Sequence, residues 1–410
     1  MLYTITHPKE SIVYYKRTLS KCLKQATAFF KVVLVTGPRQ VGKTTLLEHS
    51  RERNRTVVSL DDMDVLMMAR EDPAHFFERF PPPVLIDEVQ KAPNLFPYIK
   101  KIVDTSDAKG QFWLTGSQQF HLMRDVSESL AGRVAILDLQ GFSQSEKGKD
   151  EKRPPFLPAI PLRTQRPVWS TQETFDVIVK GSFPQLFDGT PASLFYSAYV
   201  RTYIERDVRE IVNISNEHAF LKFLKVMASR TGQALNYNNV ARDIEVSVNT
   251  VKSWVSVLET SGLIYLLPPY FRNLTKRATK TPKMYFLDTG LCCYLTGITT
   301  GEIALKHAMS GALFETYVVS EILKSYWHNG ERPFAYFYRD TLGKEIDLIL
   351  EKDGKLWPVE IKQTASPNPG MAQHFTVLAA EERGKGALIC TASKLLSMSK
   401  DVNVIPASYI

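Results

Sequence analysis

Acidic and basic side chains alternate in a segment near the C-terminus, EIDLILEKDGKLWPVEIK, at residues 345–362. The Asp-Gly pair at 353–354 is the strongest short signal for a hairpin turn, and a two-residue loop there places Asp347 opposite Glu360. Two carboxylates opposed across a sheet repel each other, and a cation between them removes that repulsion. Because Mg²⁺ prefers one or two carboxylates completed by water and phosphate, the hairpin predicts a magnesium site. Lys362, on the same strand face as Glu360, would stabilise the charge of a phosphodiester under attack.

A third acidic ligand for this site is expected from the preceding helix. In GALFETYVVSEILK, at residues 311–324, Glu315 shares a helical face with apolar residues, an unfavourable place for a carboxylate without a role. We therefore predict that Glu315, Asp347 and Glu360 ligate the metal. Together with Lys362 they would catalyse phosphodiester hydrolysis.

The same residues also fit an ordinary hairpin. Glu345 faces Lys362 in this register, so the two would form one cross-strand ion pair, while Glu360 would be solvated on an edge strand. Pro358 favours this alternative, because proline cannot donate to a central ladder and can mark a bulge that shifts the register. The sequence leaves both possibilities open.

A second chemical motif, GPRQVGKT at residues 37–44, fits the phosphate-loop pattern and follows the apolar run KVVLVTG. Glycines allow the backbone amides to surround a β-phosphate, and the positive N-terminal end of the following helix adds to the attraction. Lys43 would reach the β- and γ-phosphates, and the Thr44 hydroxyl would ligate magnesium. The residues expected to contact ATP here are Gly37, Pro38, Arg39, Gln40, Val41, Gly42, Lys43, Thr44 and Thr45.

The segment VLIDEVQ supplies the acidic partners of this loop. Its apolar run ends at Asp87, which would hold magnesium beside the nucleotide, and Glu88, which would activate the attacking water. The next strand, FWLTGSQ, ends in Thr115, Ser117 and Gln118, at the sheet edge where ligands bind in such folds. We predict Ser117 as the group that senses the γ-phosphate or orients water. A simple strand-end turn is the alternative.

An arginine that stabilises the developing charge is also expected. The candidates are Arg133 in SLAGRV, which we assign to the nucleotide site, and Arg206 in YIERDV. Each can instead be a structural ion-pair partner. If the arginine acts from a neighbouring subunit, the ATPase must be a homo-oligomer.

Short apolar strands and helical patterns must position these motifs. Strands are predicted at 56–60, 83–87, 112–116 and 134–139, and a helix at 12–29 precedes the phosphate-loop strand. Their alternation predicts an α/β fold with a parallel sheet and crossover helices. The predicted organisation is a P-loop ATPase core at 1–140, a linker or exposed loop at 141–170, a helical region at 171–216, a winged-helix-like region at 217–271 and a mixed α/β domain at 272–410.

Residues 235–262 have the pattern of a helix-turn-helix followed by the first strand of a wing. Its second helix would present exposed side chains that contact phosphates and base edges, namely Asn249, Lys252, Ser253 and Ser256. The basic segment FRNLTKRATKTPK, which ends at Lys283, follows the wing and would contact phosphates. A packing role for the helices and a solvated loop are the alternatives.

Composition favours an intracellular globular protein with a polyanionic partner. The 410 residues carry a formal net charge of +8, with a sequence pI of about 9.1, and we expect DNA, branched DNA included, as a partner. Four cysteines without a C-x-x-C pair indicate neither a zinc ribbon nor a disulfide framework, which fits a reducing cytoplasm. The N-terminus has no signal-peptide pattern, and no run reaches the roughly 18 apolar residues of a membrane helix.

The motifs together resemble a known family. GPRQVGKTT, LDD, LIDEVQKAPNLF, LTGSQQF and SLAGRV resemble an AAA-type ATPase family of bacteria and archaea. YIERDV, FLDTGL, GALFETYVVSEILK, YRD and EIDLIL with VEIK resemble the uncharacterised C-terminal domain usually attached to it. The resemblance implies an AAA-type ATP-binding core, a winged-helix element and a restriction-endonuclease-like segment, whose D…E-x-K core the hairpin matches.

Two functions follow as hypotheses. The first is an ATP- and magnesium-dependent ATPase that binds DNA and couples ATP turnover to a magnesium-dependent nuclease domain. The second is a nucleotide-switched DNA- or protein-binding or signalling module in which the nuclease-like domain is catalytically inactive. A protein-remodelling motor is a third, weaker possibility.

Overall fold

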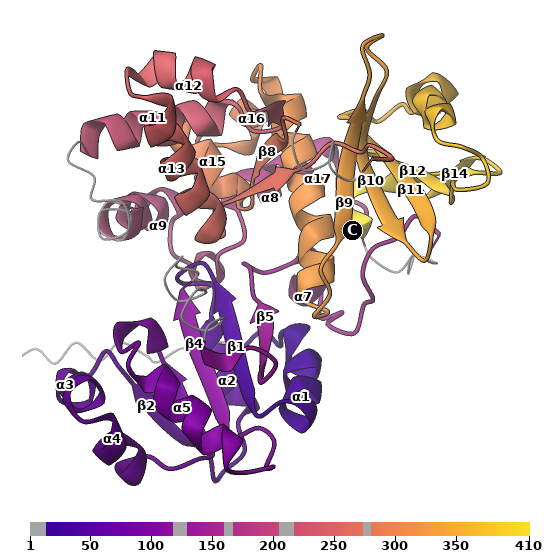
Figure 1. Ribbon diagram of the computed structural model, residues 1–410. Helices are drawn as coiled ribbons and strands as arrows, with labels where there is room; N and C mark the ends of the chain where they lie inside the picture. Colours follow the sequence, from indigo (N-terminus) through magenta and orange to yellow (C-terminus); the bar gives the residue numbers. More distant parts are fainter. Residues whose placement is uncertain (1–13, 118–128, 160–166, 205–216, 274–279) are drawn as a thin grey trace, which may run out of the picture.

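The computed structural model describes residues 14–117, 129–159, 167–204, 217–273 and 280–410, and Figure 1 shows that they form three neighbouring parts. The N-terminal part, in the lower half of the view, contains a parallel sheet. The middle part is mainly helical with a small antiparallel sheet, and the C-terminal part carries a mixed sheet. This architecture confirms the α/β class predicted from the sequence.

The N-terminal sheet has five parallel strands in the order β2-β3-β4-β1-β5. The strands are β1 (Val32–Gly37), β2 (Thr56–Ser59), β3 (Val84–Asp87), β4 (Phe112–Ser117) and β5 (Val134–Asp138). The helical elements are α1 (Leu19–Phe29), α2 (Lys43–Ser50), α3 (Met63–Glu71), α4 (Pro73–Arg79), η1 (Val89–Lys91) and α5 (Leu95–Asp104). Since β4 lies between β1 and β3, the carboxyl ends of these three strands meet at one edge of the sheet.

The central strand β1 is buried on both faces. Val33 and Val35 pack in one core cluster with residues of α1 and α2, whereas Val32 and Leu34 pack in another with residues of α3, α4 and α5. Side chains alternate along a strand, so a strand covered by helices on both sides needs apolar residues at every position. This requirement explains the unbroken apolar run that precedes the phosphate loop.

The middle part combines helices with a three-stranded antiparallel sheet of order β6-β8-β7. It starts with α8 (Thr171–Lys180), η2 (Pro184–Phe187), α9 (Ala192–Tyr199) and the π-helical turn η3 (Val200–Ile204). It continues with α11 (Glu217–Ser229), β6 (Gln233–Ala234), α12 (Tyr237–Ile244), α13 (Val248–Thr260), β7 (Ile264–Leu267), β8 (Lys283–Phe286), α15 (Thr289–Leu295) and α16 (Gly301–Lys306). Because β8 pairs with both β6 and β7, this sheet crosses the boundary that the sequence predicted at residue 271.

The C-terminal part packs the long helix α17 (Ser310–Trp327) against β8 and a six-stranded mixed sheet. The sheet order is β13-β14-β12-β11-β10-β9. Its elements are β9 (Phe334–Arg339), β10 (Glu345–Lys352), β11 (Lys355–Ile361), η4 (Pro369–Val377), β12 (Gly386–Cys390), β13 (Leu396–Ser399), β14 (Val402–Pro406) and η5 (Ala407–Tyr409). Within the described ranges, no helix combines the length and the apolar character that crossing a membrane requires.

Residues 141–159 do not form the exposed linker that the prolines and lysines of this region predicted. The short helix α7 (Gln144–Lys147) lies here, and Glu146, Phe156 and Leu157 are buried. Ser143 and Glu146 form a capping box at the start of α7, and Glu146 also binds Arg17. The prediction failed because the partner that allows a charged residue to be buried lies 129 positions away in the chain.

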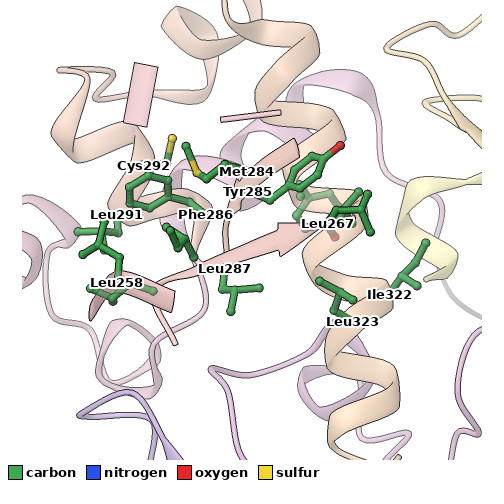
Figure 2. Packing of buried hydrophobic residues seen from close by; sticks show 14 of the residues in the cluster. Leu258, Leu267, Met284, Tyr285, Phe286, Leu287, Leu291, Cys292, Ile322 and Leu323 are labelled. Carbon is green, nitrogen blue, oxygen red and sulfur yellow. The ribbon is translucent and has the colours of Figure 1, made fainter. Parts of the chain in front are cut away.

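The main hydrophobic core continues through all three parts. Figure 2 shows residues of α13, β7, β8, α15 and α17 packed together, among them Met284 and Phe286 of β8 and Leu323 of α17. The same cluster contains Leu19 of α1 and Val33 of β1. The three parts therefore share apolar surface and are not three independent cores.

Replacing Phe286 by alanine should test this shared core. Phe286 is 1% exposed, and removing a buried phenyl ring costs about 3–5 kcal/mol because a cavity remains. Urea denaturation should give a lower midpoint for Phe286→Ala, whereas Phe334→Ala, at a 66% exposed position on β9, should unfold like the wild type. Equal midpoints for wild type and Phe286→Ala would contradict the packing in Figure 2.

Candidate functional site

The phosphate loop connects β1 to α2 with a backbone that only glycine adopts easily at its two ends. Gly37 has φ 144° and Gly42 has φ 89°, both in the region that disfavours other residues. A Cβ atom on Gly37 would lie 1.9 Å from the carbonyl oxygen of Leu139, so the loop also needs glycine for space. The loop residues expected to contact ATP thus lie in one compact turn at the carboxyl edge of the sheet.

Lys43 begins α2 and points back into this turn. Its Nζ donates to the carbonyl oxygens of Gly37 at 3.1 Å and Pro38 at 2.9 Å. Burial lowers the pKa of Lys43 to about 8, although the charges of Glu88 and Asp87 act in the opposite direction. A buried ammonium of this kind gains from an anionic partner, which a nucleotide phosphate would supply.

Asp87 and Glu88 reach the loop from β3, as predicted. The Thr44 hydroxyl donates to Asp87 Oδ1 at 2.8 Å, so the two groups expected to hold magnesium are adjacent. An oxygen donor pair of hydroxyl and carboxylate suits Mg²⁺. Glu88 has φ 56°, a strained value for a residue other than glycine, and strained backbone is concentrated at functional sites.

The side chain of Thr115, on β4, contacts these acids. Its hydroxyl donates to Asp87 Oδ1 and accepts a hydrogen bond from the Glu88 backbone N–H at 3.0 Å. The backbone of Ser117 pairs with Gly37, while its side chain and Gln118 lie outside the described residues. Since β4 lies between β1 and β3, the inward-facing residue two positions before the strand end meets the acids. The sequence signal for Thr115 was its place near the polar end of an apolar strand, and the position of β4 beside β3 brings its hydroxyl to Asp87.

Arg133 does not contact the nucleotide site of its own chain. It immediately precedes β5, and its carbonyl oxygen accepts a hydrogen bond from the N–H of Val32, the first residue of β1. Parallel strands place their first residues at the edge opposite the phosphate loop, so Arg133, predicted as a nucleotide ligand, does not serve the site of its own chain. Its guanidinium instead binds Asp104. The other candidate, Arg206, lies outside the described residues.

An aromatic cavity of about 400 Å³ opens beside the phosphate loop. The rings of Tyr14 and His49 stack with centroids 3.9 Å apart, and Tyr15, Phe142 and Pro184 complete the apolar lining. Gly42 and Thr45 line the same cavity, which therefore continues from the expected phosphate site. Flat ring surfaces suit a planar nucleobase. Sequence reasoning missed this pocket because its walls come from four separate segments.

The predicted hairpin register is confirmed up to the residues next to the acidic pair. β10 and β11 pair from Lys352–Lys355 to Leu348–Val359 without a shift. Pro358 pairs with Ile349 inside this unshifted stretch, so it marks no bulge. β11 lies between β10 and β12, with Glu360 paired to Leu388, so Glu360 is not on an edge strand.

Asp347, Glu360 and Lys362 converge, as the register predicted. Lys362 Nζ lies 3.1 Å from Asp347 Oδ2 and 2.6 Å from Glu360 Oε1, and the N–H of Ile361 donates to Asp347 Oδ2 at 2.8 Å. Both carboxylates are about 5% exposed. Burial and the Asp347 charge raise the pKa of Glu360 to about 7. Glu360 Oε2 is buried and has no hydrogen-bond partner among the residues that the structure describes.

Glu315 and Glu345 lie beside this pair but bind another cation, Lys283. Lys283 Nζ is 3.1 Å from Glu315 Oε1 and 2.6 Å from Glu345 Oε1, and Tyr285 donates to Glu315 Oε1 at 2.6 Å. Burial and the Asp347 charge raise the pKa of Glu315. The predicted ion pair between Glu345 and Lys362 is therefore replaced by one with Lys283.

The three-ligand metal site predicted from Glu315, Asp347 and Glu360 is not formed. Across the described part of the chain, no group of three or more His, Cys, Asp or Glu side chains is arranged to hold a metal ion. The reason is that Lys283 and Tyr285 bind the Glu315 carboxylate. The pair Asp347 and Glu360, with its unpartnered oxygen, still fits a divalent cation whose other ligands are water and phosphate.

In the basic segment that leads into β8, Lys283 does not have the role predicted for it. Lys283 was expected to contact nucleic-acid phosphate, but it is 5% exposed and neutralises two carboxylates. Arg272 lies 3.3 Å from Glu382, and residues 274–279 lie outside the described ranges. On α13 the predicted outward residues are exposed, namely Asn249, Lys252, Ser253 and Ser256.

Comparisons with known protein families agree with the N-terminal site. A family model described as an AAA domain matches residues 29–147. Two models described as domains of unknown function match residues 171–302 and 310–410. The AAA-domain match, together with the parallel sheet and phosphate loop, supports an AAA-type ATPase. The C-terminal domain is uncharacterised.

Two relatives align with almost the whole chain. The uncharacterized proteins Rv2008c of Mycobacterium tuberculosis and Mb2031c of Mycobacterium bovis are each 26% identical to it over 400 residues, which is 96% of this chain and 84% of the relative. Among solved structures, the Walker-type ATPase of Pyrococcus abyssi matches with a TM-score of 0.42 and 13% identity over 69% of this chain and 96% of its own.

Thr115→Val should separate nucleotide binding from hydrolysis. The substitution keeps the side-chain volume but removes the hydroxyl that bonds Asp87 and the Glu88 N–H, so we expect ATP hydrolysis to fall by about 10- to 100-fold with nearly unchanged affinity.

Lys43→Ala should lose at least about 100-fold in hydrolysis, and Lys109→Ala, at an exposed position, should match the wild type. Steady-state phosphate release measures ATP hydrolysis, and titration with a fluorescent nucleotide measures affinity. Wild-type hydrolysis by Lys43→Ala would refute the phosphate-loop assignment.

Binding of Mn²⁺ to the hairpin carboxylates should strengthen as pH rises. A proton and the cation compete for Glu360, whose pKa of about 7 keeps it mostly protonated at lower pH. Affinity should therefore rise by up to about tenfold per pH unit below pH 7 and level off above it. Electron paramagnetic resonance of nucleotide-free protein measures the bound Mn²⁺. Glu360→Gln should remove the pH dependence, and the same dependence in that variant would contradict the assignment.

Proposed function

We propose that this protein is an AAA-type ATPase that binds DNA and couples ATP turnover to magnesium-dependent phosphodiester hydrolysis in its C-terminal part. The AAA-domain match and the geometry around Lys43, Thr44 and Asp87 support ATP binding and hydrolysis. Glu88 would activate the attacking water, and Thr115 would hold Glu88 and Asp87 in place. The aromatic cavity around Tyr14 would receive the nucleobase.

One observation carries the nuclease part of the proposal. Asp347 and Glu360 project from neighbouring strands toward the same ammonium, and a buried Glu360 oxygen is left without a hydrogen-bond partner among the described residues. Leaving a buried carboxylate oxygen unpaired costs free energy, so such an atom is expected where a ligand binds. A divalent cation would be held by these two carboxylates, and it would supply a polarised water and charge neutralisation.

The reaction would be an ordinary hydrolysis. The oxygen of water would attack phosphorus, one P–O ester bond would break, and the leaving oxygen would take up a proton to give a phosphomonoester and a hydroxyl group. Lys362, which is 42% exposed at its side chain, would stabilise the charge that develops on the phosphoryl oxygens. Glu315 would act indirectly, since it contacts Lys283 rather than the Asp347 and Glu360 pair.

DNA is the polyanion we propose. The net charge of +8 and the exposed polar face of α13 support it, because Asn249, Lys252, Ser253 and Ser256 are residue types that contact phosphates and bases. The order of helices and strands from α11 to β8 is compatible with a winged helix. We also propose a cytoplasmic location, because the four cysteines are free.

A homo-oligomer is part of the proposal. ATP hydrolysis benefits from an arginine near the γ-phosphate, and Arg133 is at the far edge of its own sheet, 34% exposed at its side chain. It would therefore reach a nucleotide site only in a neighbouring subunit. Molar mass by light scattering, with and without an ATP analogue, tests this arrangement.

The second candidate is a nucleotide-switched binding or signalling module whose nuclease-like part does not cleave. Lys283 and Lys362 favour it, because they already neutralise carboxylates that a metal-dependent nuclease would use. This candidate also predicts ATP-dependent binding to DNA or to a protein. It predicts no cleavage with any metal.

A nuclease assay on branched, linear and single-stranded DNA with Mg²⁺ distinguishes the candidates. We expect cleavage by the wild type and loss of at least about 100-fold in Glu360→Gln and Lys362→Ala, since each removes charge at the reacting centre. Lys355→Ala, an exposed lysine of the same hairpin, should cleave normally. Absence of cleavage with ATP-dependent binding intact would establish the second candidate. Equal products from all four proteins would show that the hairpin does not catalyse the reaction.

A further inference from the structure

A buried guanidinium lies directly behind the phosphate loop. Arg17 is 3% exposed, and its Nη1 donates to the carbonyl oxygen of the loop residue Val41 at 2.8 Å. Its Nη2 donates to the carbonyl oxygen of Gln140 at 2.7 Å, and its Nε donates to Glu146 Oε1 at 3.0 Å. Arg17 thus joins the loop to the end of β5 and to α7.

The contact with Val41 fixes the direction of a phosphate-binding group. The peptide bond between Val41 and Gly42 is trans and planar, so its C=O and N–H point in opposite directions. Because Arg17 holds the carbonyl oxygen, the Gly42 N–H must point away from Arg17. That N–H is one of the loop donors expected to bind the nucleotide phosphates.

Glu146 connects Arg17 to a second charged segment. The carboxylate is 1% exposed and accepts hydrogen bonds from Arg17, from the Thr18 N–H at 2.9 Å and from the Ser143 N–H at 3.0 Å. Burial alone would raise its pKa, but the charge of Arg17 and the contact with His328 hold that pKa well below the usual range. Glu146 is therefore ionised, and removing its partners would leave a buried charge unpaired.

His328 brings the end of α17 into the same network. Its Nδ1 lies 3.3 Å from Glu146 Oε2, and its Nε2 accepts a hydrogen bond from the Gln140 N–H at 3.2 Å. A second bond runs from the Gln144 N–H to Glu321 Oε2 of α17 at 2.8 Å.

Near its other end, the helix α17 carries Glu315, which lies beside the proposed nuclease site. Glu315 lies in its second turn and binds Lys283 and Tyr285 of β8, while His328 directly follows its last residue. Rigid secondary elements are among the structures that carry coupling between distant sites. The phosphate loop and the carboxylate cluster are thus attached to one element.

We infer that Arg17 is a positioning residue for the phosphate loop, and that the Arg17, Glu146 and His328 network couples nucleotide binding to the position of α17. Binding of phosphate changes the hydrogen bonding of the loop, and the buried network transmits that change to the carboxyl end of α17. The inference rests on the ATP-binding part of the proposed function. It does not require that the C-terminal part cleaves DNA.

Hydrogen exchange of the full-length protein, with and without a non-hydrolysable ATP analogue and Mg²⁺, tests the coupling. Coupled sites typically differ by about 5- to 150-fold, so amides near the end of α17 should exchange at least about fivefold more slowly with the analogue bound. His328→Gln should abolish this nucleotide-dependent change while the analogue still binds. His307→Gln, a matched substitution outside the network, should preserve the change.

Arg17→Lys gives an independent readout of the positioning role. The lysine keeps the positive charge but cannot contact Val41, Gln140 and Glu146 together, so affinity for the analogue should fall by at least about fivefold. A merely structural role would instead lower the melting temperature and leave affinity and nucleotide-dependent exchange unchanged. That result would overturn the inference.

The wild-type measurement decides the question even if a variant fails to fold. If the wild type binds the analogue and exchange in α17 does not change, the coupling is refuted while ATP binding stands. If the wild type does not bind the analogue at all, the proposed ATP site fails, and the coupling fails with it.

Discussion

The burial of one carboxylate, that of Glu146, determines how the N-terminal and C-terminal parts of this protein meet. An ionised carboxylate in the interior is tolerated only when its oxygens are bound by charged or polar groups. Glu146 obtains them from the segment before α1, from its own helix and from the end of α17. These segments must therefore come together. The phosphate loop lies against them because Arg17 donates to the carbonyl oxygen of Val41.

The nucleotide site depends on the strand order of the parallel sheet. Because β4 lies between β1 and β3, Thr115 faces Asp87 and the backbone of Glu88, and the hydroxyl of Thr44 completes the set. Strand direction explains Arg133, because it precedes the first residue of β5 and so lies at the edge opposite the phosphate loop. Strand order and strand direction together thus decide which polar residues belong to the site.

In the C-terminal site, carboxylates outnumber the cationic side chains that bind them. Glu315 and Glu345 share Lys283, Asp347 and Glu360 share Lys362, and Arg339 lies 3.9 Å from Glu345, so four carboxylates face two ammonium groups and one guanidinium. Burial lowers the pKa of both lysines, but the neighbouring carboxylates raise it by more, so both lysines stay charged. The remaining negative charge and the unpartnered Glu360 oxygen are what a divalent cation would complement.

Features that depend on neighbouring residues follow directly from the sequence. The apolar run before Gly37 predicts a buried strand, the phosphate-loop pattern predicts its turn, and the Asp-Gly pair sets the register that brings Asp347 close to Glu360. Each follows from local periodicity or turn chemistry, which a short stretch of chain contains.

Features that depend on distant partners appear only once the chain has folded. Folding placed Thr115 beside Asp87, paired Lys283 with Glu315 and Glu345, and buried residues near Glu146 in a region where the sequence predicts a linker. The physical reason is that a charged side chain is stable either in water or beside an opposite charge. Composition alone does not reveal which partner a residue many positions away will supply.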